Sequence, residues 1–291
     1  MIRFLSHIEI DKLKWDNVIE TSQYPVFYAL SWYLDFVSPE WCALVEDDYV
    51  MVMPLPIKKK LGISLITQPI MSQQLGVFSK LEIQQSDLIR FLRAIPIRYP
   101  LVRLSMNVSN PSNACRDVSI KQNFVLPLSN SYIELQQNFS ANTIRNVKKA
   151  KRSEIKVKPC VSIKDAFNLF AQSNSFYNEI KYKTVLEFLV KRNCCEIVGA
   201  FGNDELLAVS FFVKDNNRYV YIASTVNLQG RKMRAQYAII NYFIESHSQE
   251  KALLDFEGSS IPSIAKFFKG FGAQKQEYFA IRMFYPFLKL S

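Results

Sequence analysis

The sequence is poor in the side chains on which many catalytic and metal sites depend. It contains two histidines, His7 and His247, and neither lies near a nucleophile motif. Ser-His-Asp and Cys-His catalysis are therefore not expected, and His247 ends a helical pattern, where a cation suits the helix dipole. The five cysteines are odd in number and form no CxxC pair. We predict no bound metal and no disulfide framework, with reduced thiols as in a cytoplasmic protein.

Long apolar runs are also missing. No window approaches a run of about eighteen uncharged apolar residues, and the N-terminus (MIRFLSHIEIDKLKW) contains acids but no apolar signal-peptide core. We expect neither a membrane span nor a signal peptide. Apolar residues nonetheless make up 49% of the chain, including 22 phenylalanines, so a globular core is expected. The length of 291 residues favours two domains.

The net charge of +10 is concentrated in one segment. Residues 140–158 hold seven bases and one acid, which is +6 of the total. Four of these bases recur at spacings of three and four residues, as on one helix face: Arg145, Lys148, Lys149 and Arg152. Two interpretations stay open: a solvated helix face, or a site for a polyanion such as the phosphates of a nucleotide, CoA or tRNA. No sequence-reading motif accompanies the stripe, so DNA is not an expected partner.

Hydrophobic periodicity predicts one order of elements twice: strand, two helices, three strands, helix, strand, helix, strand. In the first half these are expected at 1–6, 8–21, 26–37, 41–46, 49–57, 61–68, 86–95, 101–107, 112–118 and 124–128. In the second half they are expected at 154–159, 163–175, 184–192, 194–201, 205–213, 218–226, 231–248, 252–256, 261–270 and 275–284. Helices at 131–139 and 142–151 join the halves.

This repeat predicts a first domain over 1–130, a basic helical connection over 131–153 and a second domain over 154–291. The last strand is expected to pack back toward the first domain. Pro111 and Pro262 correspond at an offset of 151 residues, although residue identity between the halves is almost absent. A single α/β domain with a helical insertion stays open as the alternative.

The stretch 253–273 (LLDFEGSSIPSIAKFFKGFGA) indicates a buried strand, an acidic loop and a helix. Asp255 and Glu257 fall where the strand ends, at the edge where α/β proteins usually bind ligands. As alternate residues of a strand they would share one face. The counterpart loop in the first half, 106–110, lacks both acids. If one half carries the chemistry, we expect it to be the second.

The element order resembles the GNAT (N-acetyltransferase) fold, and two copies in tandem resemble the Fem-type family of peptidoglycan bridge-forming transferases. Two motifs carry the resemblance beyond topology: NTIRNVKKAKRSEIKV at 142–157 and DFEGSSIPSIAKFFKGFGA at 255–273. The first is similar to the family's basic helix before the second domain, and the second to its strand, loop and helix. The implied fold is α/β (α+β), with two tandem GNAT-like domains, each a mixed, mostly antiparallel sheet flanked by helices.

The resemblance implies an N-acyltransferase that moves an acyl or aminoacyl group to an amine of a small molecule or cell-wall precursor. The expected donor is an acyl-CoA such as acetyl-CoA, because the RNA-sized arm of some Fem-type members is absent. Aminoacyl-tRNA stays open, because the turn at 227–235 holds only one glycine where acetyl-CoA enzymes have several. The alternative function is a non-catalytic GNAT-fold module that binds an anionic ligand or RNA.

The expected acyl transfer in turn suggests site residues. Glu257 and Asp255 are the predicted proton acceptors, although Asp255 could instead shape the turn that follows. Lys269 is implied to face the donor, with dipole compensation as the alternative, and Tyr285 or Tyr278 would protonate the leaving group. Backbone N–H groups over 222–226 would polarise the carbonyl. The predicted donor-binding residues are Ser224, Thr225, Val226, Gln229, Gly230, Arg231, Arg234 and Ala235, where the arginines hold phosphate by charge or form a solvated first turn.

Overall fold

The computed structural model describes residues 1–112, 118–258 and 261–284. The chain forms two compact units: unit 1 holds Met1–Gln122 together with the chain from Gln276 onward, and unit 2 holds Asn123–Lys275. The helices between the two predicted halves, 131–153, therefore belong to unit 2, because the second of them packs on a long helix of that unit. None of the described helices is long and apolar enough to span a bilayer.

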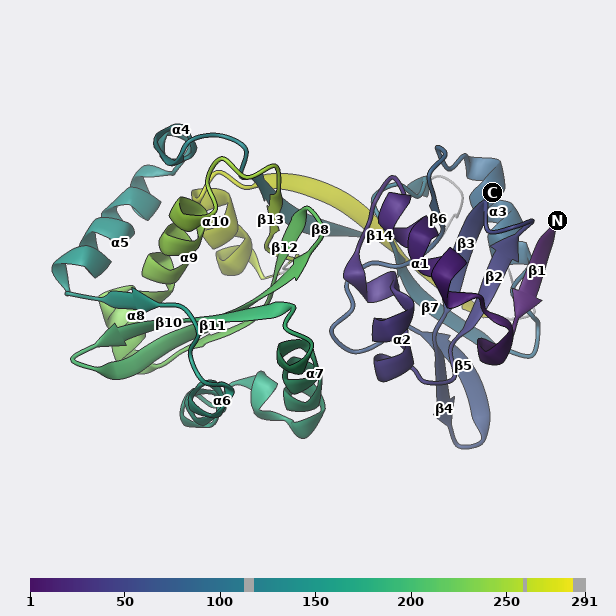
Figure 1. The fold of residues 1–291 in the computed structure, drawn as a ribbon, viewed down its shortest axis with the longest axis horizontal. Helices are drawn as coiled ribbons and strands as arrows, with labels where there is room; N and C mark the ends of the chain where they lie inside the picture. The colour runs from purple at the N-terminus through teal and green to yellow at the C-terminus, as the bar shows by residue number, and fades with distance from the viewer. Residues whose placement is uncertain (113–117, 259–260, 285–291) are drawn as a thin grey trace. The chain divides into compact units, whose positions relative to one another are not determined.

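Unit 1 contains two sets of hydrogen-bonded strands (Figure 1). One has the order β1-β2-β3-β6: β1 (Ile2–Leu5), β2 (Cys42–Glu46), β3 (Met51–Leu55) and β6 (Phe78–Ser79). The other runs β4-β5-β7-β14: β4 (Ile57–Lys60), β5 (Ile63–Thr67), β7 (Leu101–Met106) and β14 (Gln274–Phe284). Its helices are α1 (Lys12–Thr21), α2 (Ser31–Val37) and α3 (Gln85–Arg93), with 3-10 turns at His7–Glu9 and Phe27–Ala29.

Side-chain caps explain where two helices of unit 1 begin. The helix expected at 8–21 starts at Lys12, because the Asp11 carboxylate accepts hydrogen bonds from the N–H groups of Leu13 and Lys14. The helix expected at 26–37 is interrupted, and α2 starts at Ser31, whose N–H and hydroxyl both donate to the Asp16 carboxylate. Asp16 lies on α1, so a tertiary contact sets this boundary. The helix expected at 112–118 lies almost wholly outside the described residues.

Unit 2 is built on strands in the order β8-β13-β12-β11-β10-β9. The strands are β8 (Val118–Pro127), which enters from unit 1, β9 (Lys156–Lys158), β10 (Cys195–Gly202), β11 (Glu205–Asp215), β12 (Arg218–Val226) and β13 (Leu253–Asp255). The helices are α4 (Tyr132–Gln137), α5 (Ala141–Arg152), α6 (Ile163–Gln172), α7 (Ile180–Lys191), α8 (Leu228–Met233), α9 (Ala235–Ser246) and α10 (Pro262–Gly270), with a 3-10 turn at Phe176–Asn178. Within these six strands the pairings are antiparallel except that of β12 with β13.

Helices cover both faces of the unit 2 sheet: α6 and α7 lie on one side of β10 and β11, and α5 and α9 on the other (Figure 1). Two consecutive phenylalanines of β11 serve the two faces, because successive strand residues point to opposite sides. The Phe211 ring packs against Phe170 of α6 at 5.7 Å, and the Phe212 ring stacks on Phe243 of α9 at 3.7 Å. The second of these contacts holds α9 against β11.

Candidate functional site

The parallel strands β12 and β13 separate within unit 2. Their pairing ends at Val220 with Asp255, whereas β12 continues to Val226 paired only with β11. The register with β11 also slips by one residue at Ile222, which makes a β-bulge. Beyond Val220, the edge of β12 that faces β13 has no strand partner among the described residues. This unpaired range overlaps residues 222–226, whose backbone N–H groups the sequence analysis expected to polarise the carbonyl.

A buried tyrosine reaches the bulge from the α6–α7 side. The Tyr177 hydroxyl donates to the Ile222 carbonyl oxygen at 3.1 Å. Burial raises the pKa of Tyr177 far above its usual range, and the negative charge of Glu257 raises it further. The phenol of Tyr177 therefore stays protonated at neutral pH. The Glu257 carboxylate lies close enough to the separated strands to affect the pKa of Tyr177 electrostatically.

Asp255, a predicted proton acceptor, is fully engaged inside unit 2. Its side chain forms an ion pair with Arg218 of β12, and both residues are buried. Its other carboxylate oxygen accepts the backbone N–H of Glu257 at 2.8 Å. An amine substrate could contact Asp255 only by displacing one of these partners. Through the Glu257 N–H, Asp255 holds the start of the loop.

Glu257 lies in a different environment from Asp255. The strand ends at Asp255, and Glu257 has a left-handed backbone with φ of 54°, so the alternation of strand faces does not extend to it. A non-glycine residue in this region is strained by about 1–3 kcal/mol, and such strain clusters at functional sites. The hydrogen bond from its N–H to Asp255 holds this conformation. Glu257 is less deeply buried than Asp255.

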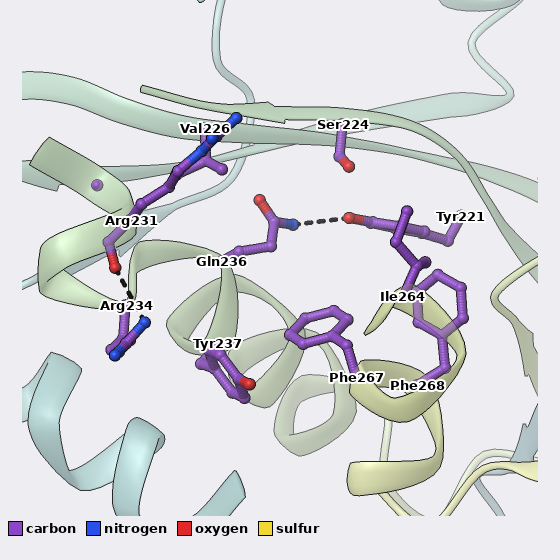
Figure 2. A pocket seen from close by; sticks show the side chains of 11 residues that line it. Tyr221, Ser224, Val226, Arg231, Arg234, Gln236, Tyr237, Ile264, Phe267 and Phe268 are labelled. Atoms are coloured by element: carbon purple, nitrogen blue, oxygen red, sulfur yellow. Dashed lines mark hydrogen bonds between the residues drawn. The ribbon is translucent and has the colours of Figure 1, made fainter. Parts of the chain in front are cut away.

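A cavity of about 380 Å³ opens beside the free part of β12. Figure 2 shows Arg231 and Arg234 at one end, the α10 side chains Ile264, Phe267 and Phe268 at the other, and Gln236 between them. The lining residues are Tyr221, Ser224, Val226, Gly230, Arg231, Arg234, Gln236, Tyr237, Ile264, Phe267 and Phe268. The cavity thus joins a cationic mouth to an aromatic interior.

The Gln236 side chain links two hydroxyl groups beside this cavity. The Gln236 side-chain amide donates to the Tyr221 hydroxyl at 2.8 Å and to the Ser210 hydroxyl at 2.6 Å. Its carbonyl oxygen is buried and has no hydrogen-bond partner in the described part of the chain, which leaves it ready to accept an N–H from a ligand. Burial raises the pKa of Tyr221 to about 12, so its hydroxyl is also protonated at neutral pH.

The helix expected at 231–248 is broken at Arg234, which separates α8 from α9. Arg234 has a left-handed backbone with φ of 67°, and no side chain caps the first turn of α9. The N–H groups of that turn are therefore without a side-chain acceptor, next to two guanidinium groups at the cavity mouth. Such a helix start attracts anions.

Gly230, the one glycine of the predicted phosphate turn, has a packing role. Its N–H already donates to the Asn227 side chain at 2.7 Å, so it is not free for a phosphate. A Cβ at Gly230 would stand 2.6 Å from the backbone carbonyl oxygen of Leu207 on β11. The residue allows α8 to lie directly on the sheet.

We expect Gly230→Ala to destabilise unit 2 by about 1–3 kcal/mol, because the added methyl group would meet backbone that cannot rotate away. Urea unfolding followed by circular dichroism measures the loss. Lys232→Ala on the same helix, where the side chain is exposed, should change stability by less than about 0.5 kcal/mol. Equal stability of the two variants would contradict the close packing of α8 on Leu207.

The structure brings some of the predicted donor-binding residues together and leaves others apart. Five of the eight line the cavity: Ser224, Val226, Gly230, Arg231 and Arg234. Three are not among its lining residues: Thr225, Gln229 and Ala235. Six further lining residues were not predicted: Tyr221, Gln236, Tyr237, Ile264, Phe267 and Phe268. The three from α10 recur at helical spacing, but that spacing alone cannot distinguish a core stripe from a cavity wall.

Within the described chain, none of the other predicted residues is among those that line this cavity. Lys269 is exposed on α10, with its ammonium nitrogen 5.6 Å from the centre of the Phe124 ring. Tyr278 is buried in β14, and Tyr285 lies outside the described residues. The stripe of Arg145, Lys148, Lys149 and Arg152 is exposed on α5, where these side chains make no ion pair with any described residue. In the described part of the chain, no group of histidine, cysteine or acidic side chains could hold a metal ion.

The counterpart loop of unit 1, residues 106–110, is held by hydrogen bonds to Val77. The side-chain amides of Asn107 and Asn110 both donate to the Val77 carbonyl oxygen, at 3.0 and 2.9 Å. Asn110 in turn accepts the Val77 N–H at 2.9 Å. Both asparagines are buried. These hydrogen bonds fix the loop in place. It contains no acidic residue, in contrast to the loop that carries Glu257.

The separated strands, the bulge and the helix that starts beside them define a GNAT-type fold, and comparison with solved structures extends this to a tandem of two. FemX superposes with a TM-score of 0.66 over 93% of this chain and 96% of its own, at 10% identity. A GNAT-family acetyltransferase from Colwellia psychrerythraea has a TM-score of 0.57, 11% identity, and coverage of 98% and 99%. A tandem GNAT protein from the clavulanic acid biosynthesis pathway has a TM-score of 0.53, 10% identity, and coverage of 97% and 98%.

These likenesses confirm the predicted mixed α/β architecture and the Fem-like tandem GNAT fold over almost the whole chain. At such low identity they establish the fold alone. No protein-family model matches the sequence, and no curated protein matches it either.

Proposed function

We propose that unit 2 is an N-acyltransferase that moves an acyl group from an acyl-CoA to an amine. The observation that carries this proposal is the cavity at the separated strands, which has a cationic mouth and an aromatic interior. An acyl-CoA has the matching polarity, with phosphates at one end and a pantetheine arm and acyl chain at the other. A metal is not part of the proposed chemistry.

Three features would bind the donor. Arg231, Arg234 and the uncapped start of α9 would hold the phosphates at the mouth. Phe267 and Phe268 would cover the pantetheine arm and the acyl chain. The unpaired carbonyl oxygen of Gln236 would accept an amide N–H, of which pantetheine has two. Gly230 would serve by packing, and Lys269 is left without a direct role.

The reaction would take place at the gap between β12 and β13. Backbone N–H groups of β12 beyond Val220 would polarise the thioester carbonyl. Glu257 would take a proton from the ammonium group, so that the neutral amine can attack the thioester carbon and form the C–N bond. Tyr221, protonated at neutral pH, would donate a proton to the sulfur as the C–S bond breaks. Asp255 would position Glu257 and would not contact the substrate.

The acceptor is proposed to be an amine on a small molecule or a cell-wall precursor, in the cytoplasm where acyl-CoA and such precursors occur. An aminoacyl-tRNA is the second candidate donor, and the exposed stripe of Arg145, Lys148, Lys149 and Arg152 favours it. A third outcome is a non-catalytic module that binds an anionic ligand or RNA. The donor experiment separates these three.

The test is a thermal-shift and calorimetric titration of the full chain with acetyl-CoA, octanoyl-CoA and charged tRNA. A specific donor at a hundred times its dissociation constant should add ~2.7 kcal/mol of stability. Arg234→Gly should weaken acyl-CoA binding by about tenfold without loss of folding, because glycine relieves the left-handed backbone. Lys266→Gln, an exposed change on α10, is the matched control. Stabilisation by tRNA alone would transfer the proposal to that donor, and stabilisation by none would reject it.

A further inference from the structure

A second cavity, of about 370 Å³, lies on the strands of unit 1 and shares no residue with the cavity of unit 2. Three of its lining side chains are cations from three different strands: Arg103 of β7, Lys121 of β8 and Arg282 of β14. No carboxylate is among its lining residues, and all three cations are exposed to solvent. The cavity is therefore strongly basic.

The strand register places two of these charges directly opposite each other. Arg103 and Arg282 are partners in the antiparallel ladder of β7 and β14. Like charges at such a position destabilise a sheet unless something neutralises them. In the described residues, none of the three cations forms an ion pair or hydrogen bond with another side chain. The Arg282 guanidinium does lie 4.8 Å from the centre of the Phe284 ring, which supports one orientation of it.

Polar groups with spare donors complete the cavity. Ser105 and Ser119 line it, and neither hydroxyl is engaged elsewhere within the described chain. Gln68 fixes the strand edge beside them, because its carbonyl oxygen accepts the Ser105 N–H at 3.0 Å and its amide donates to the Ser72 carbonyl oxygen at 3.1 Å. The cavity thus presents two guanidinium forks, one ammonium and two hydroxyls, and all of these are donors.

We propose that this cavity binds the phosphate group of a phosphorylated small molecule. A phosphate dianion offers three acceptor oxygens, and arginine forks recognise it through paired hydrogen bonds. One such anion between Arg103 and Arg282 would neutralise the like-charge pair that the register creates. The small concave volume fits a mono- or diphosphate group and does not fit a nucleic-acid duplex. Unit 1 is then a ligand-binding unit in its own right, independent of acyl transfer in unit 2.

Inorganic phosphate and pyrophosphate are the probes, compared with sodium chloride at equal ionic strength, by thermal shift and calorimetry on the full chain. We expect saturable binding that raises the melting temperature beyond the effect of chloride. Arg282→Gln should lower phosphate affinity by about tenfold or more. The same variant should melt at a higher temperature than the wild type when phosphate is absent, because the cross-strand repulsion is gone.

Lys60→Gln provides the matched control, since Lys60 is an exposed cation of β4 in the same unit but outside the cavity. It should leave both phosphate affinity and the phosphate-free melting temperature unchanged. Three results would overturn the proposal: an equal effect of chloride, an equal loss of affinity in Lys60→Gln, or a lower phosphate-free melting temperature in Arg282→Gln. None of these readouts depends on acyltransferase activity.

Discussion

Asp255→Ala is expected to lower the stability of unit 2 by about 3–5 kcal/mol, because it removes the carboxylate that forms a buried ion pair with Arg218. Arg218 is only 7% exposed and Asp255 only 1%, so water cannot replace the lost partner. A loss of this size is a large part of the 5–15 kcal/mol typical of a folded domain. The variant should therefore populate a state with unit 2 unfolded in mild urea.

The chain permits a measurement that separates the two units. Its three tryptophans, Trp15, Trp32 and Trp41, all lie in unit 1. Tryptophan fluorescence therefore follows unit 1, whereas circular dichroism follows both units. In Asp255→Ala, the dichroism transition should shift to lower urea concentration, while the fluorescence transition stays close to that of the wild type.

Two further variants control for this result. Replacing both partners with apolar residues, Arg218→Met with Asp255→Leu, should recover most of the lost stability, since no unpaired charge remains buried. Glu40→Ala breaks the exposed pair with Lys59, in which both side chains are 62% exposed, and should cost less than about 1 kcal/mol. A small loss of stability in Asp255→Ala would mean that another group replaces Asp255 as the partner of Arg218. It would also contradict the proposal that Asp255 positions Glu257.

Local pattern was sufficient to predict most strands of unit 2, although β8 begins at Val118 and the expected strand began at residue 124. The sequence places β12 at 218–226, with the same bounds as the structure, and the turns that precede it carry Asn203, Asp204 and Asn216 in left-handed conformations. Asparagine and aspartate tolerate that conformation, so the turn signals have a direct physical cause. The separation of β12 from β13 has no local signal in the sequence.

The features that the sequence did not reveal depend on contacts between distant residues. Nothing in the sequence between 231 and 248 interrupts the helical pattern, yet the helix breaks at Arg234, which has a left-handed backbone. The partner of Asp255 is 37 residues away along the chain, and no spacing rule connects it to Arg218. Tyr221 resembles any buried strand residue until α10 is placed across from it. A candidate site that is built from several helices and strands can be recognised only once the packing of those elements is known.

Glu257→Gln is expected to lower kcat by about 10²- to 10⁴-fold with little change in donor affinity, because an amide cannot take the proton of the ammonium group. The two side chains have nearly the same size, and the backbone hydrogen bond from residue 257 to Asp255 is retained, so folding should be unaffected. Steady-state assays of acyl transfer measure kcat, and calorimetry measures donor affinity separately.

The matched control is Glu187→Gln, which removes the same charge from an exposed position on α7 and should leave kcat unchanged. A kcat in Glu257→Gln equal to that of the control would remove Glu257 from the mechanism. If the wild type itself binds acyl-CoA and transfers nothing to any amine tested, a change in donor binding alone in Glu257→Gln would favour the non-catalytic module.

Because the strained Glu257 backbone is held by Asp255, weakening that carboxylate should reproduce part of the kinetic defect. Asp255→Asn should therefore lower kcat less than Glu257→Gln does, and lower stability more.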